Sequence, residues 1–261
     1  MCGICISKIN YSCKKYNIFK ILQQIEDNIH LKDLKSSLIK ARLLKSNITF
    51  IELIQRKNKN YEDKLNNIVL KLKREFLKKV DQNDSITDLI WVIESEILFK
   101  CKRIIDFLDK NKIPISKKSI IFTRYLLYCL ESINYLESRG RDSFGISINS
   151  IFPRKVQLNK KQFFSNKNEF SLKQLKIKNG RYLISLNFKY AERIGYSGEN
   201  TKKILDKIIN SKIIKNFKFD EILNTDFIAH TRWASVGKVN LSNAHPIINE
   251  SKNNINLSFM N

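Results

Sequence analysis

The sequence predicts an α+β fold in which about a hundred helical residues interrupt a domain of strands and helices. Apolar residues recur every three or four positions from Ile18 to Ile97, the spacing of amphipathic helices. The segment SFGISIN at 143–149 alternates as a strand does, and LKIKNGRYLISLNF at 175–188 places Asn-Gly between two β-rich runs. An Asn-Gly pair in this position is typical of a hairpin turn.

The expected helices follow from three apolar stripes, after which further helical signals appear. Pro114 disfavours helical geometry just before itself, so the third stripe should end near residue 112. We therefore expect a helical region at 14–112, another helix at about 119–138 before Gly140, and a capped helix in ENTKKILDKIIN at 199–210. The stripes are Ile18, Leu22, Ile25 and Ile29; Tyr61, Leu65, Ile68, Leu72 and Phe76; and Ile86, Leu89, Ile93 and Ile97.

Composition narrows the class of protein. The chain has 261 residues, of which 43% are hydrophobic, enough for one substantial core. Its five cysteines are odd in number and unevenly spread, which is unlike a secreted disulfide scaffold, and the cytoplasm fits best. The longest apolar run, SIIFTRYLLYCL, is about half the length of a membrane span and contains Arg124, so we expect no transmembrane helix.

The formal charge of +23 is compatible with a polyanionic partner, but the lysines are distributed along the whole chain. A clustered basic footprint is absent from segments such as NKKQFFSNKNEF and IIKNFKF, where lysine is mixed with asparagine and apolar residues. Such runs are typical of a solvated surface. We therefore expect neither nucleic acid nor a membrane as a partner.

The first residues, MCGIC, permit three interpretations. Cys2 and Cys5 have the spacing of a redox pair or of half a zinc site, and Cys2 becomes the first residue if Met1 is removed. A thioredoxin-like pair would stand at a helix start within a βαβ pattern. A zinc site of Cys2, Cys5, His230 and His245 lacks the usual short spacing between its histidines. We expect no metal and no cofactor.

Four segments together resemble one family: MCGI at the start, LESRGRDSFGISI at 136–148, IAHTRWASVG at 228–237 and NAHP at 243–246. They resemble the glutaminase domain of class II glutamine amidotransferases, most closely that of glutamine–fructose-6-phosphate aminotransferase. The resemblance implies an N-terminal-nucleophile hydrolase fold, a four-layer αββα sandwich, formed by 1–13 and 113–261 with 14–112 inserted. It also implies that the sandwich is incomplete after Asn261, where the family continues with a glycine.

The resemblance implies a role for each matching residue. Cys2 would be the nucleophile, since its thiol attacks and its freed α-amine, with a pKa of roughly 8, takes the proton. Arg232 would bind the α-carboxylate of glutamine, because a guanidinium fork matches a carboxylate, and Trp233 would help gate the ammonia passage. The remaining roles are oxyanion stabilisation by Asn261, support by Arg139 and Asp142, and structural positions for His230 and His245. Cys5 would fill a buried strand position.

The function that the resemblance implies is hydrolysis of L-glutamine to glutamate and ammonia. In the full-length family members, the ammonia serves the synthesis of glucosamine 6-phosphate from fructose 6-phosphate, bound by a downstream isomerase domain that this sequence lacks. The expected fragment would by itself turn over glutamine poorly. The sequence leaves the oligomeric state open, with a homodimer of the full-length protein as one option. The alternatives are another class II glutaminase, of the amidophosphoribosyltransferase or asparagine synthetase type, and a non-catalytic helical scaffold with a decayed amidotransferase remnant.

Overall fold

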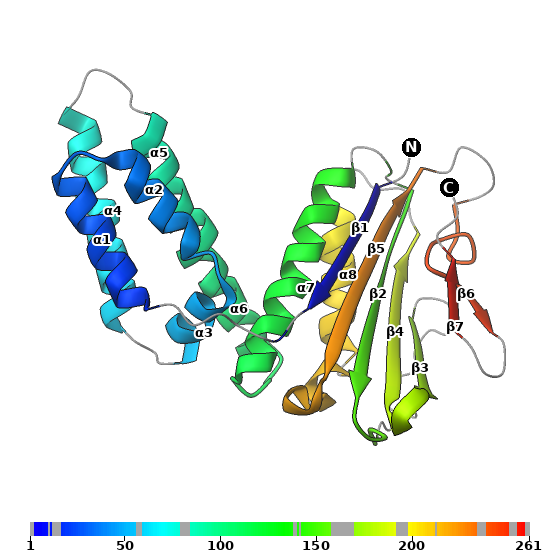
Figure 1. Ribbon diagram of the computed structural model, residues 1–261. Coiled ribbons are helices and arrows are strands. Elements are labelled where there is room, and N and C mark those ends of the chain that lie inside the picture. Colours follow the sequence, from blue (N-terminus) through cyan, green and yellow to red (C-terminus); the bar gives the residue numbers. More distant parts are fainter. Residues whose placement is uncertain are drawn as a thin grey trace. The chain divides into compact units, whose positions relative to one another are not determined.

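The computed structural model describes residues 3–9, 11, 17–55, 59–78, 84–137, 140, 142–157, 170–191, 198–211, 213–233, 239–250 and 255–258. The chain divides into two compact units (Figure 1). The sheet unit contains Met1–Tyr11, Asn111–Ile113 and Phe122–Asn261, and the helical unit contains Ser12–Lys110 and Pro114–Ile121. Helices and antiparallel strands occur together, so the fold is α+β.

The helical unit is built from amphipathic helices. Two of them begin at a side-chain cap: Asn17 accepts a hydrogen bond from the Lys20 N–H and Asp33 accepts one from the Ser36 N–H, both at 3.1 Å. The described helical segments are α1 Ile18–His30, α2 Leu34–Leu43, α3 Asn47–Gln55, α4 Lys59–Lys78, α5 Asp84–Trp91, the π-helical η1 Val92–Leu98 and α6 Phe99–Lys110. The three predicted apolar stripes lie on α1, on α4, and on α5 with η1.

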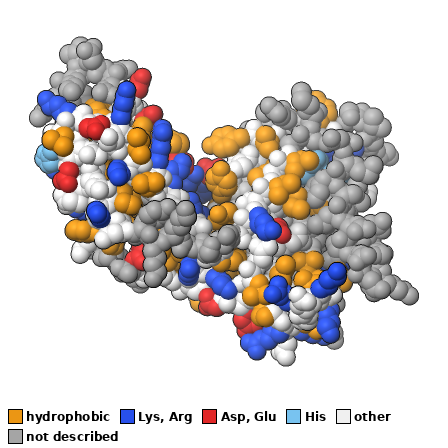
Figure 2. Space-filling model, in the orientation of Figure 1, with side chains coloured by type: hydrophobic (Ala, Val, Ile, Leu, Met, Phe, Trp, Pro, Cys, Tyr) orange, Lys and Arg blue, Asp and Glu red, His pale blue; other side chains and the backbone are white. Residues whose placement is uncertain are grey.

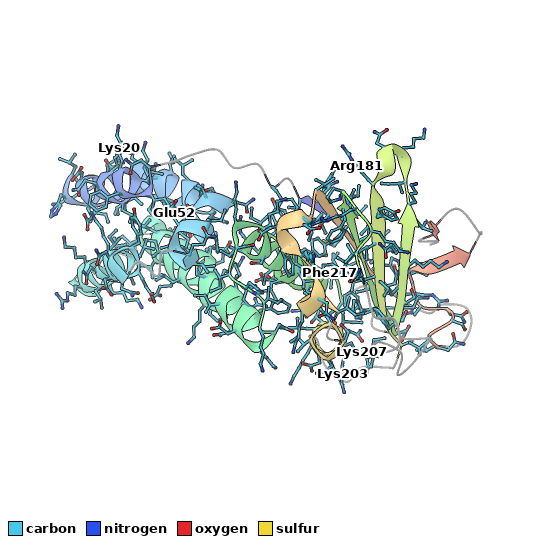
Figure 3. The ribbon with its side chains drawn as sticks, turned by 90° about the horizontal axis from the view of Figure 1, so that it is seen from below. Lys20, Glu52, Arg181, Lys203, Lys207 and Phe217 are labelled. Carbon is cyan, nitrogen blue, oxygen red and sulfur yellow. The ribbon has the colours of Figure 1, made fainter. Side chains whose placement is uncertain are left out.

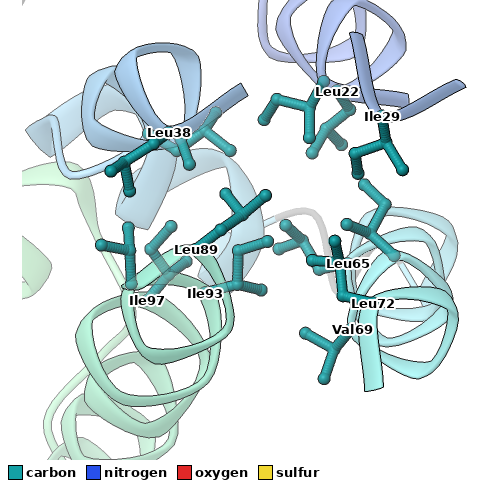
Figure 4. Packing of buried hydrophobic residues seen from close by; sticks show 14 of the residues in the cluster. Leu22, Ile29, Leu38, Leu65, Val69, Leu72, Leu89, Ile93 and Ile97 are labelled. Carbon is teal, nitrogen blue, oxygen red and sulfur yellow. The ribbon is translucent and has the colours of Figure 1, made fainter. Parts of the chain in front are cut away.

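The core of the helical unit is made by those stripes. Figure 4 shows Leu22 and Ile29 of α1, Leu38 of α2, Leu65, Val69 and Leu72 of α4, and Leu89, Ile93 and Ile97 of α5 and η1. Each of these side chains is buried. Removing this apolar area from water stabilises the helices, which would be marginal in isolation. An apolar cluster of this kind is what the periodicity predicts.

The sheet unit contains a five-stranded sheet with the order β1-β5-β2-β4-β3. All of its neighbouring strands pair antiparallel. Its strands are β1 Gly3–Ile9, β2 Ser143–Phe152, β3 Phe170–Lys176, β4 Tyr182–Tyr190 and β5 Asn224–Arg232. The predicted hairpin joins β3 to β4, where Asn179 and Gly180 adopt φ values of 61° and 69°. The Asn-Gly prediction is therefore confirmed.

One face of this sheet is covered by α7 (Lys117–Leu136) and α8 (Glu199–Asn210) (Figure 1). Aromatic rings fill the space between: Phe122 of α7 lies 5.3 Å from Phe227 of β5, and Phe217 lies 5.7 Å from Phe152 of β2 (Figure 3). Because side chains alternate along a strand, Gly145 of β2 belongs to the opposite face. There the segment at 244–246 leads into β6 (Ile247–Glu250), which pairs antiparallel with β7 (Ile255–Ser258).

Helix α8 begins with a contact between segments distant in the chain. The predicted helix at 199–210 is present, but its cap residue is Gly198, which has φ 92° and no side chain that could cap the helix. The Gly198 N–H instead donates to the carboxylate of Glu137, at the end of α7. A buried anion at a helix N-terminus satisfies an orphan N–H and complements the helix dipole. Farther along, Lys207 lies over the Tyr190 ring at 4.9 Å (Figure 3).

On the surface, charged and apolar side chains are interspersed. In the view of Figure 2, Lys and Arg side chains are spread over both units and alternate with acidic and hydrophobic ones. Within the described part of the chain, no helix combines the length and the apolar character that crossing a membrane requires.

Candidate functional site

The candidate site lies at one end of the sheet, where the three neighbouring strands β1, β5 and β2 begin or end. Gly3 of β1 pairs with Thr231 of β5, and Arg232 of β5 pairs with Ser143 of β2. The pairing continues past β2, because the Asp142 N–H donates to the Arg232 carbonyl at 3.1 Å. The described residues of three remote motifs, namely Gly3, Asp142–Ser143 and Thr231–Arg232, therefore lie at adjacent strand ends.

Gly140 lets the chain approach Arg232 closely. A Cβ at this position would stand 2.8 Å from the Arg232 carbonyl carbon and 3.0 Å from the Trp233 nitrogen, both backbone atoms. The Gly140 N–H also donates to the Glu137 carbonyl at 3.1 Å, which ties this residue to the end of α7. The sequence suggested a helix stop at Gly140; the structure adds that a larger residue would not fit.

Arg232 is oriented by the loop that precedes β6. Its Nη1 donates to the carbonyl oxygen of Asn243 at 3.2 Å. The loop is itself closed by Asn240, whose Oδ1 accepts hydrogen bonds from the Ser242 hydroxyl and the Asn243 N–H, each at 2.8 Å. The bond to Asn243 ties the guanidinium to this loop, and the planar fork of a guanidinium is the geometry that matches a carboxylate.

The same loop is pressed against the sheet at Gly145. A Cβ on Gly145 would be 1.7 Å from the carbonyl oxygen of His245 and 3.0 Å from Pro246 Cδ. The peptide bond between His245 and Pro246 is cis. Glycine is thus required for the backbone of this loop to reach the strand.

The ring of His245, in this loop, stacks on the ring of His230, in β5. Their ring centroids are 4.5 Å apart, and the residues are 1% and 4% exposed. Burial, followed by the charges of His245 and Arg232, lowers the pKa of His230 to about 4. Burial, followed by Arg232 and Lys189, also lowers the pKa of His245. Both rings are therefore neutral near pH 7, which agrees with a structural role better than with proton transfer to substrate.

These depressed pKa values predict that the sheet unit loses stability in mild acid. An unfolded histidine has a pKa of 6.5, whereas folded His230 has one of about 4, so between these values the unfolded chain binds more protons. The stabilising contribution is complete above pH 6.5 and is lost as the pH falls towards 4. We expect His230→Gln to reduce the pH dependence of the free energy of unfolding, measured from urea unfolding curves between pH 7 and pH 5, by up to about 1.4 kcal/mol per pH unit.

The control for this prediction is His30→Gln, which removes an exposed histidine from α1 in the helical unit. Its free energy of unfolding should follow the wild-type dependence on pH. Fluorescence of Trp233 in a Trp91→Phe background reports on the sheet unit alone, because the chain has two tryptophans. A His230→Gln slope equal to the wild-type slope would contradict the prediction.

The structure brings together five of the residues expected at the site: Asp142, His230, Arg232, Trp233 and His245. Trp233 follows Arg232 directly and is 54% exposed, so it is not a core residue. The expected nucleophile Cys2, the supporting Arg139 and the oxyanion residue Asn261 lie outside the described residues.

Sequence reasoning missed two contributors to the site, Gly145 and Asn243, whereas it placed Ser143 with Asp142 at the turn into the strand. The Ser143 hydroxyl is buried next to Arg232 in the β-ladder and makes no hydrogen bond to any of the described residues. Asn243 acts through its backbone carbonyl, which no side-chain pattern could reveal. Gly145 was visible in SFGISIN, but its requirement comes from a loop about a hundred residues later.

Metal binding finds no support in the described residues. Cys5 and Ile4 alternate on β1, and Ile4 is the residue that pairs with His230, so the Cys5 side chain belongs to the opposite face of the sheet. Within the described ranges, no group of three or more His, Cys, Asp or Glu side chains is arranged to hold a metal ion.

Comparison of the chain with family models, with curated proteins and with solved structures found no match.

Proposed function

We propose that the protein is the glutaminase part of a class II glutamine amidotransferase, of the glutamine–fructose-6-phosphate aminotransferase type. One observation carries the proposal: Gly3, the residue bonded to Cys2, pairs with Thr231, the residue bonded to Arg232. Consecutive residues along a chain have Cα atoms about 3.8 Å apart. The residue that follows the proposed nucleophile and the residue that precedes the proposed carboxylate-binding group thus pair in neighbouring strands, although they come from opposite ends of the sequence.

The chemistry that this pairing would serve is attack on an unreactive side-chain amide. After removal of Met1, Cys2 offers a thiol nucleophile and, in its own α-amine, a base whose pKa is near the operating pH. The thiol attacks the amide carbon of glutamine, ammonia leaves, and water later releases glutamate from the thioester. Asn261 would stabilise the oxyanion with its side-chain amide.

Arg232 would select glutamine by binding its α-carboxylate. Its guanidinium is held at 3.2 Å by the Asn243 carbonyl, and the loop that supplies this carbonyl is itself fixed against Gly145. A group held in this way loses little conformational entropy when it binds a planar anion. Asp142 supports the arrangement through its backbone bond to Arg232, and Trp233, exposed beside it, would help gate the release of ammonia.

The fold proposed with this function is the four-layer αββα sandwich of N-terminal-nucleophile hydrolases. Two features support it. Helices α7 and α8 cover one face of the five-stranded sheet, and on the other face the 244–246 segment leads into the antiparallel β6–β7 pair. In the complete enzyme, ammonia would pass to fructose 6-phosphate on an isomerase domain, giving glucosamine 6-phosphate in the cytoplasm.

The experiment is labelling with a diazo-ketone analogue of glutamine followed by peptide sequencing in the mass spectrometer. We expect one label per chain, on Cys2, in peptides that have lost Met1, and we expect excess L-glutamine to prevent it. Fragment ions separate Cys2 from Cys5, which share the tryptic peptide that ends at Lys8. Labelling that persists in Cys2→Ser, or falls on Cys5 or Cys129, would contradict the proposal. A chain that retains Met1 and takes no label would favour the non-catalytic scaffold.

A further inference from the structure

Two cysteines of the sheet unit that the proposed reaction does not use lie in contact. Along β1, Ile4 and Ile6 are exposed on one face, and Cys5, between them, faces α7. Cys129 of α7 is fully buried. The Cys129 thiol donates a hydrogen bond to the Cys5 sulfur, and Cys5 makes a second hydrogen bond with the Ser132 side chain. Neither cysteine is part of a disulfide.

The contact makes the two thiols chemically unequal. The hydrogen bond from Cys129 lowers the pKa of Cys5 to about 7, against the opposing effect of partial burial, and Ser132 lowers it further. The same hydrogen bond and burial raise the pKa of Cys129. A thiolate is the reactive form of cysteine, so Cys5 is the nucleophile of the pair and Cys129 its resolving partner.

Cys5 is also the more accessible of the two. Strand β1 is at the edge of the five-stranded sheet, with β5 as its neighbour, and Cys5 is only partly buried. A small oxidant can thus approach Cys5 from solvent, whereas Cys129 is fully buried.

We propose that Cys5 and Cys129 are a redox modification site that forms a reversible disulfide when the chain meets a peroxide. The Cys5 thiolate attacks one peroxide oxygen, the O–O bond breaks, and Cys5 becomes a sulfenic acid while hydroxide leaves. The Cys129 sulfur then attacks the Cys5 sulfur, its proton passes to the departing hydroxide, and water is released. In sum, two thiols and one hydrogen peroxide give one disulfide and two waters. A dithiol such as dithiothreitol reverses the reaction by exchange.

The disulfide would have a specific consequence for β1. It joins the strand covalently to α7 and closes a loop that contains every residue of the helical unit, since Ser12–Lys110 and Pro114–Ile121 all lie between the two cysteines. Cross-links that close long loops restrict the unfolded chain most strongly. Oxidation should therefore slow amide hydrogen exchange along β1. The inference does not depend on glutaminase activity.

The test is treatment of the reduced chain with hydrogen peroxide, followed by tryptic mapping without reduction. We expect an intact-mass loss of two hydrogens and a linked pair of peptides, one ending at Lys8 and the other spanning Tyr125–Arg139. The link should persist in Cys2→Ser, Cys13→Ser and Cys101→Ser and be lost in Cys5→Ser. Between pH 5 and pH 6 the initial rate should rise about tenfold, as the thiolate fraction of Cys5 does.

Circular dichroism of Cys5→Ser separates loss of the link from loss of the fold, because this partly buried position should accept serine without unfolding. A link that survives in Cys5→Ser, or is lost in Cys2→Ser, would assign it to other cysteines and overturn the inference. Oxidation of Cys5 to a sulfinic acid, without any linked peptide, would also overturn the inference.

Discussion

Gly145→Ala is expected to lower the free energy of unfolding of the sheet unit by about 3 kcal/mol. The added Cβ would be 1.7 Å from the His245 carbonyl oxygen and 2.7 Å from its carbonyl carbon. Both are backbone atoms, so no rotation of a side chain relieves the overlap. Either the loop moves off the sheet, which breaks the stacking of His245 on His230, or β2 bends in the middle of its ladder.

Urea unfolding of the sheet unit, followed by Trp233 fluorescence in the Trp91→Phe background, measures this effect. Gly180→Ala is the matched control: nothing lies within 4 Å of its Cβ, but its φ of +69° strains any L-residue. We expect this control to cost about 1–2 kcal/mol, from backbone strain alone. If the Gly145 variant were no less stable than the Gly180 variant, the loop would not pack on β2 as described.

Arg232→Lys is expected to lower kcat/KM for glutamine by about a hundredfold in a chain with glutaminase activity. A hydrogen bond to a charged group contributes about 1.5–3 kcal/mol, and each 1.36 kcal/mol corresponds to a factor of ten in rate. Lysine keeps the charge but has neither the planar fork nor the geometry that lets one group bind both the Asn243 carbonyl and a carboxylate. The measurement is glutamate release over a range of glutamine concentrations.

Arg181→Lys is the control for this substitution, because Arg181 is exposed at the β3–β4 hairpin (Figure 3). The next residue, Tyr182, pairs with Phe152 at one end of β2. Arg232 instead pairs with Ser143, at the other end of β2. Arg181→Lys should leave kcat/KM unchanged. A wild-type kcat/KM in Arg232→Lys would show that Arg232 does not bind the substrate. Equal losses in both variants would show that replacing an arginine by lysine affects the fold in general, and not the site.

Local sequence patterns predicted the elements whose formation depends mainly on residues close together in the sequence. The stripe from Ile18 to Ile29 predicted α1 because burial of one face decides whether an amphipathic helix forms. The hairpin was visible for the same reason, since Asn179 and Gly180 adopt positive φ values at small cost. The motifs also drew attention to Arg232 and His245, which the structure brings to the same strand ends.

Contacts between remote segments were beyond sequence patterns. The register that pairs Gly3 with Thr231 depends on the whole sheet, and no local pattern encodes it. The Glu137 carboxylate at the start of α8 and the thiol contact of Cys5 with Cys129 also arise only when separate elements pack. The same is true of Gly145, whose neighbour in space is a loop that precedes β6.

The core of the helical unit affects how the sequence of such a protein can change in evolution. Among the described residues, the hydrophobic side chains that form that buried cluster or pack against it lie between Ile18 and Leu98. A substitution that enlarges one side chain there can be compensated by a smaller one on a facing helix, with no matching change among the strands. The helices and the sheet are thus able to accumulate mutations at separate rates, and selection on the Arg232 site places little restraint on the residues that fill the helical core.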